Sequence, residues 1–180
     1  IDPKTGVALV DGTGATAEDL GIDPDKLSTL DADGLGKLGD SAFKNFSSDQ
    51  VKDLDADALG GLSSSQLGNL APKAVSGLTG DQLGGLSKDS LGGFNASQIA
   101  GIDKDAIGSL TSVQLGGLSA LAVGGLTGDQ VKGMSADSVS GLGANQLGGM
   151  RPDALGGLDS AQVGGLTKDA LGGLGAQQMG

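Results

Sequence analysis

Aspartates separated by one residue are the feature of this sequence that comes closest to a chemical site. Asp55 with Asp57, and Asp103 with Asp105, each place two carboxylates near one another. Carboxylate oxygens are the ligands that Ca²⁺ prefers, so these four residues are weak calcium candidates. The pairs lack the Gly-Gly-x-Gly-x-Asp signature of Ca²⁺-binding repeats, and each stands where a helix would begin, a place that favours acidic residues without a metal. We therefore expect helix caps, no metal and no cofactor.

Catalysis has little else to use in this chain. The sequence contains no His and no Cys, which excludes Ser-His-Asp triads and sites built from thiolate ligands to zinc. A Ser–Lys pair remains formally available, but Ser in capping positions and Lys in solvent account for these residues. The glycine pairs are not followed by Lys and Ser or Thr, so they do not form a phosphate-binding loop. We expect a protein that is not an enzyme.

Charge and hydropathy limit the partners. There are 22 acidic and 11 basic residues, for a net charge of -11. Nucleic acids and anionic membranes attract basic surfaces, so neither is expected as a partner. No apolar run approaches the roughly 20 residues of a membrane-spanning helix, and we expect no membrane span.

An eight-residue repeat is the organising feature of the chain. Apolar residues recur at every eighth position from Leu27 to Leu171, and a second series follows three residues later, from Leu30 to Leu174. We number these octad positions 1 and 4. Residues three apart share one face of a helix but lie on opposite faces of a strand, which favours short helices. Position 5 is mostly Ser, Thr, Asp, Asn or Gly and position 7 is often Asp, as at a helix N-terminus.

A second period of sixteen residues comes from position 8, where Gln alternates with Ala or Ser. We predict a repeat solenoid made mainly of short α- or 3₁₀-helices, with two octads in each 16-residue coil; a β-solenoid with 16-residue coils is the alternative. Like octads would then stack in columns, and the glutamines would form a structural ladder. These glutamines are Gln50, Gln66, Gln82, Gln98, Gln114, Gln130, Gln146 and Gln162.

Glycine pairs at positions 2 and 3 lie between the two buried aliphatic residues, at positions 1 and 4, of many octads. Glycine is unfavourable inside a helix, so its recurrence indicates close packing between neighbouring coils. The pairs singled out are Gly84, Gly85, Gly92, Gly93, Gly116, Gly117, Gly124 and Gly125. The octad solenoid is expected over residues 16–180. Residues 1–15 are expected to be an N-terminal cap or the continuation of a longer chain.

Two stretches carry a resemblance to a known class of repeats. They read LTSVQLGGLS at 110–119 and LTGDQVKGMS at 126–135. They resemble the Leu-x-x-Leu-Thr-x-x-Gln octads of very long secreted or surface-attached bacterial proteins, over residues 16–180. The resemblance implies an adhesin-like or matrix-like role outside the cell or on the bacterial surface.

Taken together, the repeats and the lack of catalytic residues predict a structural solenoid. We expect the stalk of a bacterial adhesin or the subunit of a self-associating surface filament. Its partners would be copies of itself, end to end or side by side, or the rest of a larger surface protein. The alternative is a binding module whose repetitive face recognises a polysaccharide or ice.

Overall fold

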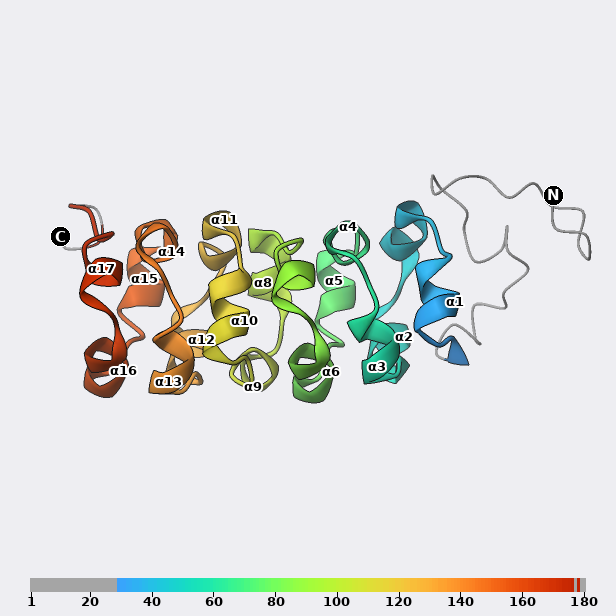
Figure 1. Ribbon diagram of the computed structural model, residues 1–180, viewed down its shortest axis with the longest axis horizontal. Helices are drawn as coiled ribbons and strands as arrows, with labels where there is room; N and C mark the ends of the chain where they lie inside the picture. Colours follow the sequence, from blue (N-terminus) through green and yellow to red (C-terminus); the bar gives the residue numbers. More distant parts are fainter. Residues whose placement is uncertain (1–28, 177, 179–180) are drawn as a thin grey trace, which may run out of the picture.

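The structure is a computed structural model, and it describes residues 29–176 and residue 178. In these residues the chain forms a row of short helices, one from each octad, with no strand (Figure 1). The prediction of short helices is confirmed, and the β-solenoid alternative is wrong for the part of the chain described. The segment 1–15, predicted to be a cap or a continuation, lies outside the described residues.

The helices are four to six residues long and follow one another at intervals of about one octad. Their bounds are α1 Ala32–Gly36, η2 Asp40–Asn45 (a 3₁₀-helix), α2 Ser48–Asp53, α3 Ala56–Gly60, α4 Ser64–Gly68, α5 Pro72–Val75, α6 Gly80–Gly85, α7 Lys88–Leu91, α8 Ala96–Gly101, α9 Lys104–Ile107, α10 Ser112–Gly117, α11 Ala120–Val123, α12 Gly128–Lys132, α13 Ala136–Val139, α14 Ala144–Gly149, α15 Pro152–Leu155, α16 Ser160–Gly165 and α17 Lys168–Leu171.

Each helix begins at octad position 6, and the residue at position 5 is its N-cap, as the sequence predicts. Before α6, the Thr79 hydroxyl accepts a hydrogen bond from the backbone N–H of Gln82 (3.3 Å), and the Gln82 side chain accepts one from the backbone N–H of Thr79 (2.9 Å). This capping box satisfies two of the N–H groups that a helix start leaves without partners. Where Ala71 provides no capping side chain, Pro72 occupies the first helical position and has no N–H to satisfy.

The coil of the solenoid contains three octads. Away from the two ends of the described row, each helix packs on the third helix before it and the third after it, so α6 contacts α3 and α9. Equivalent residues in stacked helices are 24 residues apart, as Ala56 and Gly80 are at the starts of α3 and α6. The prediction of two octads in a 16-residue coil is therefore wrong.

The backbone between helices explains the three-helix coil. Leu86, at position 4, and Ser87, at position 5, are both extended, with ψ of 139° and 155°. Two extended residues turn the chain only part of the way round. Three such connections bring the chain back over its starting helix, as the contact of α6 with α3 shows.

Stacked helices form three columns along the rod. The first column holds α1, α3, α6, α9, α12 and α15, the second holds η2, α4, α7, α10, α13 and α16, and the third holds α2, α5, α8, α11, α14 and α17. In Figure 1 the second column passes from the upper edge at α4 to the lower edge at α13 and α16. The columns therefore wind around the long axis of the rod.

The aliphatic residues of positions 1 and 4 point into one core that runs through all the coils. Leu83 and Leu86 of α6 have exposed fractions of 0% and 3%, and the buried apolar residues from Leu35 to Ala170 form a single cluster. Burying a side chain of this size contributes about 1.5–3 kcal/mol. No helix in the described residues is long and apolar enough to cross a membrane.

Candidate functional site

The glutamines at position 8 connect successive coils. The Gln82 side-chain N–H₂ donates to the backbone carbonyls of Val51 (2.9 Å) and Leu54 (2.6 Å), where α2 ends one coil earlier. Its carbonyl oxygen at the same time accepts from the Thr79 N–H. One buried amide thus satisfies both the start of its own helix and the end of a helix in the coil before. Carbonyls at a helix end otherwise lack intrahelical partners, so this bond stabilises the stack.

The other glutamines from Gln66 onward repeat this arrangement. Their side-chain amides donate to pairs of carbonyls at octad positions 1 and 4, 31 and 28 residues earlier: Gln66 to Leu35 and Leu38, Gln98 to Leu67 and Leu70, Gln114 to Leu83 and Leu86, Gln130 to Ile99 and Ile102, Gln146 to Leu115 and Leu118, and Gln162 to Val131 and Met134. Gln50 forms the capping box of α2 with Ser47.

These contacts place the glutamines in a different arrangement from the one expected. Gln82 and Gln98, which are neighbours in the 16-residue period, lie in the first and third columns. The next glutamine above Gln82 in its own column is Gln130, and Ala106 of α9 lies between them. From Ala58 onward in the first column, and throughout the other two, Gln alternates with Ala or Ser at position 8. The full chemical pattern therefore repeats only after two coils.

The two glycines of a pair contact opposite neighbours. A Cβ on Gly117 would come within 2.6 Å of the backbone oxygen of Lys88, in the coil before. A Cβ on Gly116 would instead meet the backbone oxygen of Gly141, in the coil after, at 3.1 Å. Position 3 therefore packs backward along the rod and position 2 packs forward. Both contacts are with backbone, which cannot move aside as a flexible side chain can.

The remaining glycines singled out from the sequence differ in how tightly they are enclosed. At position 3, Gly93 and Gly125 have no room for a Cβ, and a Cβ on Gly85 would lie at 3.4 Å from the Ala56 oxygen. At position 2, Gly92 and Gly124 face carbonyls at 3.5 and 2.9 Å. Gly84 has no atom within 4 Å of the place a Cβ would take. Contact with a neighbouring coil is thus a property of most of these glycines, but not of Gly84.

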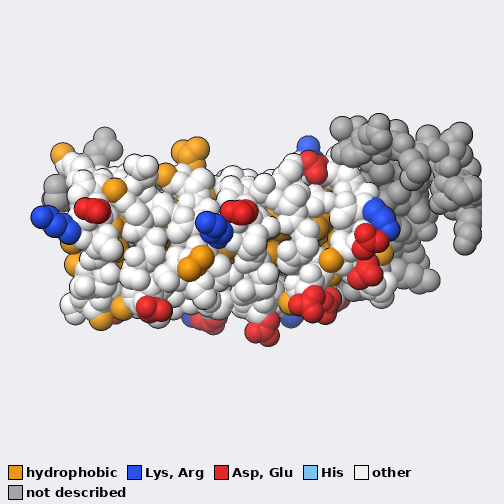
Figure 2. Space-filling model, in the orientation of Figure 1, with side chains coloured by type: hydrophobic (Ala, Val, Ile, Leu, Met, Phe, Trp, Pro, Cys, Tyr) orange, Lys and Arg blue, Asp and Glu red, His pale blue; other side chains and the backbone are white. Residues whose placement is uncertain are grey.

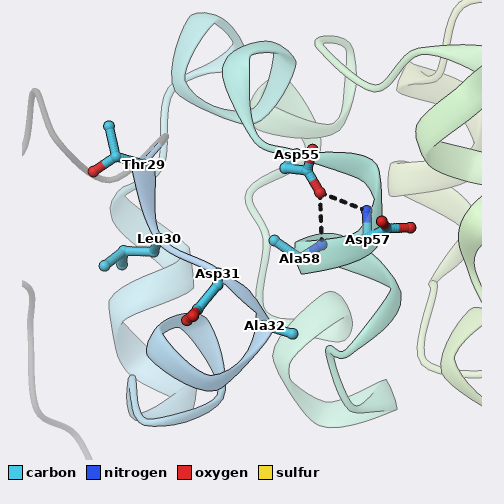
Figure 3. A pocket seen from close by; sticks show the side chains of 7 residues that line it. All are labelled: Thr29, Leu30, Asp31, Ala32, Asp55, Asp57 and Ala58. Atoms are coloured by element: carbon cyan, nitrogen blue, oxygen red, sulfur yellow. Dashed lines mark hydrogen bonds between the residues drawn. The ribbon is translucent and has the colours of Figure 1, made fainter.

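Of the calcium candidates, Asp55 and Asp103 are helix N-caps, and Asp57 and Asp105 lie in the first turns of α3 and α9. In Figure 3, one Asp55 carboxylate oxygen accepts from the backbone N–H groups of Asp57 (2.9 Å) and Ala58 (3.3 Å). Asp103 accepts from the Asp105 N–H in the same way, at 2.8 Å. Asp55 and Asp57 line an open pocket of about 360 Å³ together with Thr29, Leu30, Asp31, Ala32 and Ala58. Within the described residues no group of three or more acidic side chains is arranged to hold a metal.

The structure reveals an acidic column that the 16-residue period conceals. In all six helices of the first column, position 7 is Asp: Asp33, Asp57, Asp81, Asp105, Asp129 and Asp153. Figure 2 shows acidic side chains along the lower edge of the rod over α3, α6 and α9. The other two columns mix acidic, polar, basic and apolar residues at this position. A search of the sequence for a 24-residue period in Asp would have revealed this series.

Three exposed ion pairs lie on the acidic column: Lys37 with Asp33, Lys104 with Asp105, and Lys132 with Asp129. Hydrogen bonds to the aspartates raise the pKa of Lys37 and of Lys104. Because all these side chains are exposed, the pairs add little to stability.

Two large apolar side chains stand on the surface where most other octads have polar residues. Val113 of α10 and Leu121 of α11 occupy position 7 and are 66% and 83% exposed. They belong to one coil but to different columns. Isolated exposed apolar residues are common on protein surfaces, and these two do not form a contiguous patch with the core.

Ionisable side chains in the described part of the chain all reach solvent, and the buried polar residues are Gln and Ser alone. The buried Gln and Ser side chains supply contacts between coils. A comparison with protein-family models and a search of curated proteins each find no match for this chain.

Proposed function

We propose that this chain is a structural, non-catalytic spacer, a rigid solenoid that acts as the stalk of a bacterial surface protein. The observation that carries the proposal is one uninterrupted core, enclosed by the same coil-to-coil contact from α1 to α17. Repeat proteins of this kind gain stability from contacts between neighbouring repeats. A continuous stack therefore keeps its two ends at a set separation, which is what a stalk requires.

The use of polar groups supports this role. Gln98 is fully buried, and its side-chain amide bonds with backbone groups at Asn95, Leu67 and Leu70. Ser90 is buried and donates to the Leu62 carbonyl at 2.8 Å. In the described residues every buried side-chain nitrogen and oxygen has a hydrogen-bond partner. The buried polar side chains thus hold neighbouring coils together. The resemblance to secreted octad proteins supports a place outside the cell.

Analytical ultracentrifugation tests the stalk proposal. We expect one elongated species whose frictional ratio exceeds that of a compact globule of equal mass and does not change with protein concentration. A compact globule would overturn the proposal of a rigid spacer. A series of species growing with concentration would replace the stalk with the self-associating filament.

The acidic column favours a second candidate, a binding module for a polysaccharide. Its six aspartates repeat at the spacing of the coils, and carboxylates accept hydrogen bonds from sugar hydroxyls. A regular array could match a periodic target. Ice is a weaker candidate, because ice-binding faces show regular Thr ranks whereas position 5 of this column reads Asp55, Thr79, Asp103 and Thr127 in successive coils.

Retention on immobilised polysaccharides tests this second candidate. The triple variant D81N/D105N/D129N removes three charges from the acidic column, and D49N/D89N/D137N removes three from the other columns. Loss of retention in the first variant alone would support a binding face on the acidic column. Equal retention by both variants and the parent chain, or no retention by any, would exclude it.

A further inference from the structure

Close contacts between helices in the described part of the chain all cross from one coil to the next. α6 contacts α3 in the coil before and α9 in the coil after, and the helices of each column continue this pattern. Successive helices of one coil, such as α6 and α7, are not in close contact in these residues, although their apolar residues belong to the same core. Each coil is therefore held in place chiefly by the coils on either side.

Backbone hydrogen bonds hold the local shape of each octad. The Leu83 N–H donates to the Thr79 carbonyl at 3.0 Å, and the Leu86 N–H donates to the Leu83 carbonyl at 3.1 Å. The bonds of this kind between described residues at turns and helix ends all join residues three or four positions apart. In a stack of β-strands the backbone itself would link neighbouring coils, whereas here the backbone bonds run along the chain.

Hydrogen bonds between coils come from side chains in the described residues. The Gln98 amide donates to the Leu67 and Leu70 carbonyls, at 2.8 and 2.7 Å, and the Ser109 hydroxyl donates to the Gly80 carbonyl at 3.1 Å. Such bonds span 25 to 31 positions, or about one coil. Each boundary between coils is therefore closed by a few side-chain bonds and by apolar contact within the core.

The coils are arranged in series along the long axis of the rod (Figure 1). A load along this axis acts on every boundary, and detaching one coil breaks contacts with its immediate neighbours while the other boundaries stay closed. The detached segment cannot keep its shape, because helices of four to six residues are unstable in water without packing partners. Tension therefore converts a folded coil into extended chain.

The short sequence span of these contacts favours restacking. The capping box of Thr79 and Gln82 forms within one octad, and the bonds from Gln82 to Val51 and Leu54 reach back about one coil. The entropy cost of closing a loop rises with its length, and contacts between residues near in sequence form fast. A detached coil beside a folded coil can therefore re-form its contacts when the load falls.

We propose that the rod is an extensible tether, in which tension detaches and extends one 24-residue coil at a time and the coils restack when the tension falls. An extended residue spans about 3.3–3.6 Å and packed helices lie about 8–10 Å apart, so each detached coil should lengthen the chain by roughly 70 Å. Below the detachment force the rod keeps its length, as a stalk requires. The benefit of this property rests on the proposed stalk, but the stepwise extension does not, so the sedimentation test and the force test can fail independently.

Optical-tweezers measurements on the full chain test the proposal. The sequence contains no Cys, so the double variant D57C/D153C provides two attachment points in the first column. Four coil boundaries lie between them, since α3, α6, α9, α12 and α15 follow one another in this column. The variant D57C/D105C places two boundaries under load. We expect contour-length gains of roughly 70 Å per step, and a total gain in the first variant twice that in the second.

Weakening one boundary locates the step within the rod. Gln98→Ala, added to D57C/D153C, removes the side-chain bonds to the Leu67 and Leu70 carbonyls. We expect one step to occur at lower force and the other steps to keep the force of the parent variant. Ser97→Ala changes an exposed side chain in the first turn of the same helix and should leave every step unchanged.

Repeated pulling of one molecule tests the restacking. The steps of the first extension should return after the load is released and applied again. A single extension of the whole loaded segment would overturn the proposal, and so would the loss of the steps in the second pull. The comparison of D57C/D153C with D57C/D105C decides between stepwise and all-or-none extension even where Gln98→Ala prevents folding.

Discussion

Gly93 lies so close to the backbone carbonyl of Ser64, in the coil before it, that no residue with a Cβ fits in its place. Its neighbour Gly92 faces the other way, toward the Gly117 carbonyl in the coil after, at 3.5 Å from the place of a Cβ. Both glycines follow the last helical residue of α7, Leu91. The core residues of adjacent coils can meet only if the backbones approach, and glycine at these two positions allows that approach.

Replacing Gly93 with alanine should destabilise the rod by several kcal/mol. The new methyl group would overlap backbone atoms, so the two coils would have to move apart and loosen the core between them. The free energy of unfolding, measured by urea denaturation followed by circular dichroism, should fall by about 3 kcal/mol or more.

Gly84→Ala is the matched control for this substitution. Gly84 lies inside α6 and has no atom within 4 Å of the place of a Cβ, whereas Gly93 follows the end of α7. Alanine there should leave stability unchanged or raise it by about 0.5–1 kcal/mol through helix propensity. Equal effects of the two substitutions would contradict the role of Gly93 in the contact between coils.

The three-octad coil predicts which surface positions can be cross-linked. Asp81 of α6 and Asp105 of α9 occupy equivalent positions in stacked helices, and packed helices lie about 8–10 Å apart. In the otherwise cysteine-free chain, Asp81→Cys with Asp105→Cys should react rapidly within one molecule with a short bismaleimide. The pair Asp81→Cys with Ser97→Cys, sixteen residues apart and in different columns, should react slowly. Mass spectrometry measures both reactions. Faster cross-linking of the second pair would show that the coil contains two octads and not three.

The local structure could be predicted from the sequence because its causes are local. Thr79 and Gln82 form a capping box from their spacing alone, and Leu83 and Leu86 share a buried face for the same reason. The number of octads in a coil could not be derived in this way. It depends on the backbone angles at residues such as Leu86 and Ser87, which many side chains allow.

The 16-residue alternation concealed the coil because its period differs from that of the fold. Gln82 and Gln98 suggested that like octads stack, whereas Gln82 stacks in its column with Ala106. The capping role of Gln82 was predictable, but its bonds to Val51 and Leu54 were not, since they join residues about 30 positions apart. Asp81 and Asp105 are 24 residues apart, and the recurrence of Asp at this interval indicates the length of the coil.

Helix capping predicts opposite effects for two substitutions in the third column. Ala71 starts α5 without a side-chain cap, whereas the Ser119 hydroxyl, at the start of α11, accepts from the Ala122 N–H at 3.1 Å. Ala71→Ser should raise the free energy of unfolding by about 1 kcal/mol, and Ser119→Ala should lower it by a similar amount. Chemical denaturation of the two variants beside the parent chain measures both. A loss of stability in Ala71→Ser would show that packing of Ala71 against the core outweighs the cap.

Gln98 provides the sharpest test of the bonds between coils. It is fully buried, and its side-chain N–H₂ donates to the carbonyls of Leu67 (2.8 Å) and Leu70 (2.7 Å). Gln98→Ala leaves these two carbonyls without that donor and opens a cavity, which should cost about 3 kcal/mol. Urea denaturation at neutral pH measures the loss.

Gln98→Glu preserves the size of the side chain and makes the same bonds depend on pH. An ionised carboxylate facing two carbonyl oxygens is unfavourable, whereas the protonated acid can donate to one of them, so the pKa of this carboxyl should rise above its usual value of about 4.3 in the folded state. Since the folded state then holds its proton more tightly than the unfolded state, stability should be greatest below about pH 4 and should fall as the pH rises above it. Ser97→Glu, exposed in the first turn of the same helix, should show no such loss, because an acid there interacts favourably with the helix N-terminus. A Gln98→Glu variant as stable at pH 7 as the parent chain would contradict the role of the amide as a donor between coils.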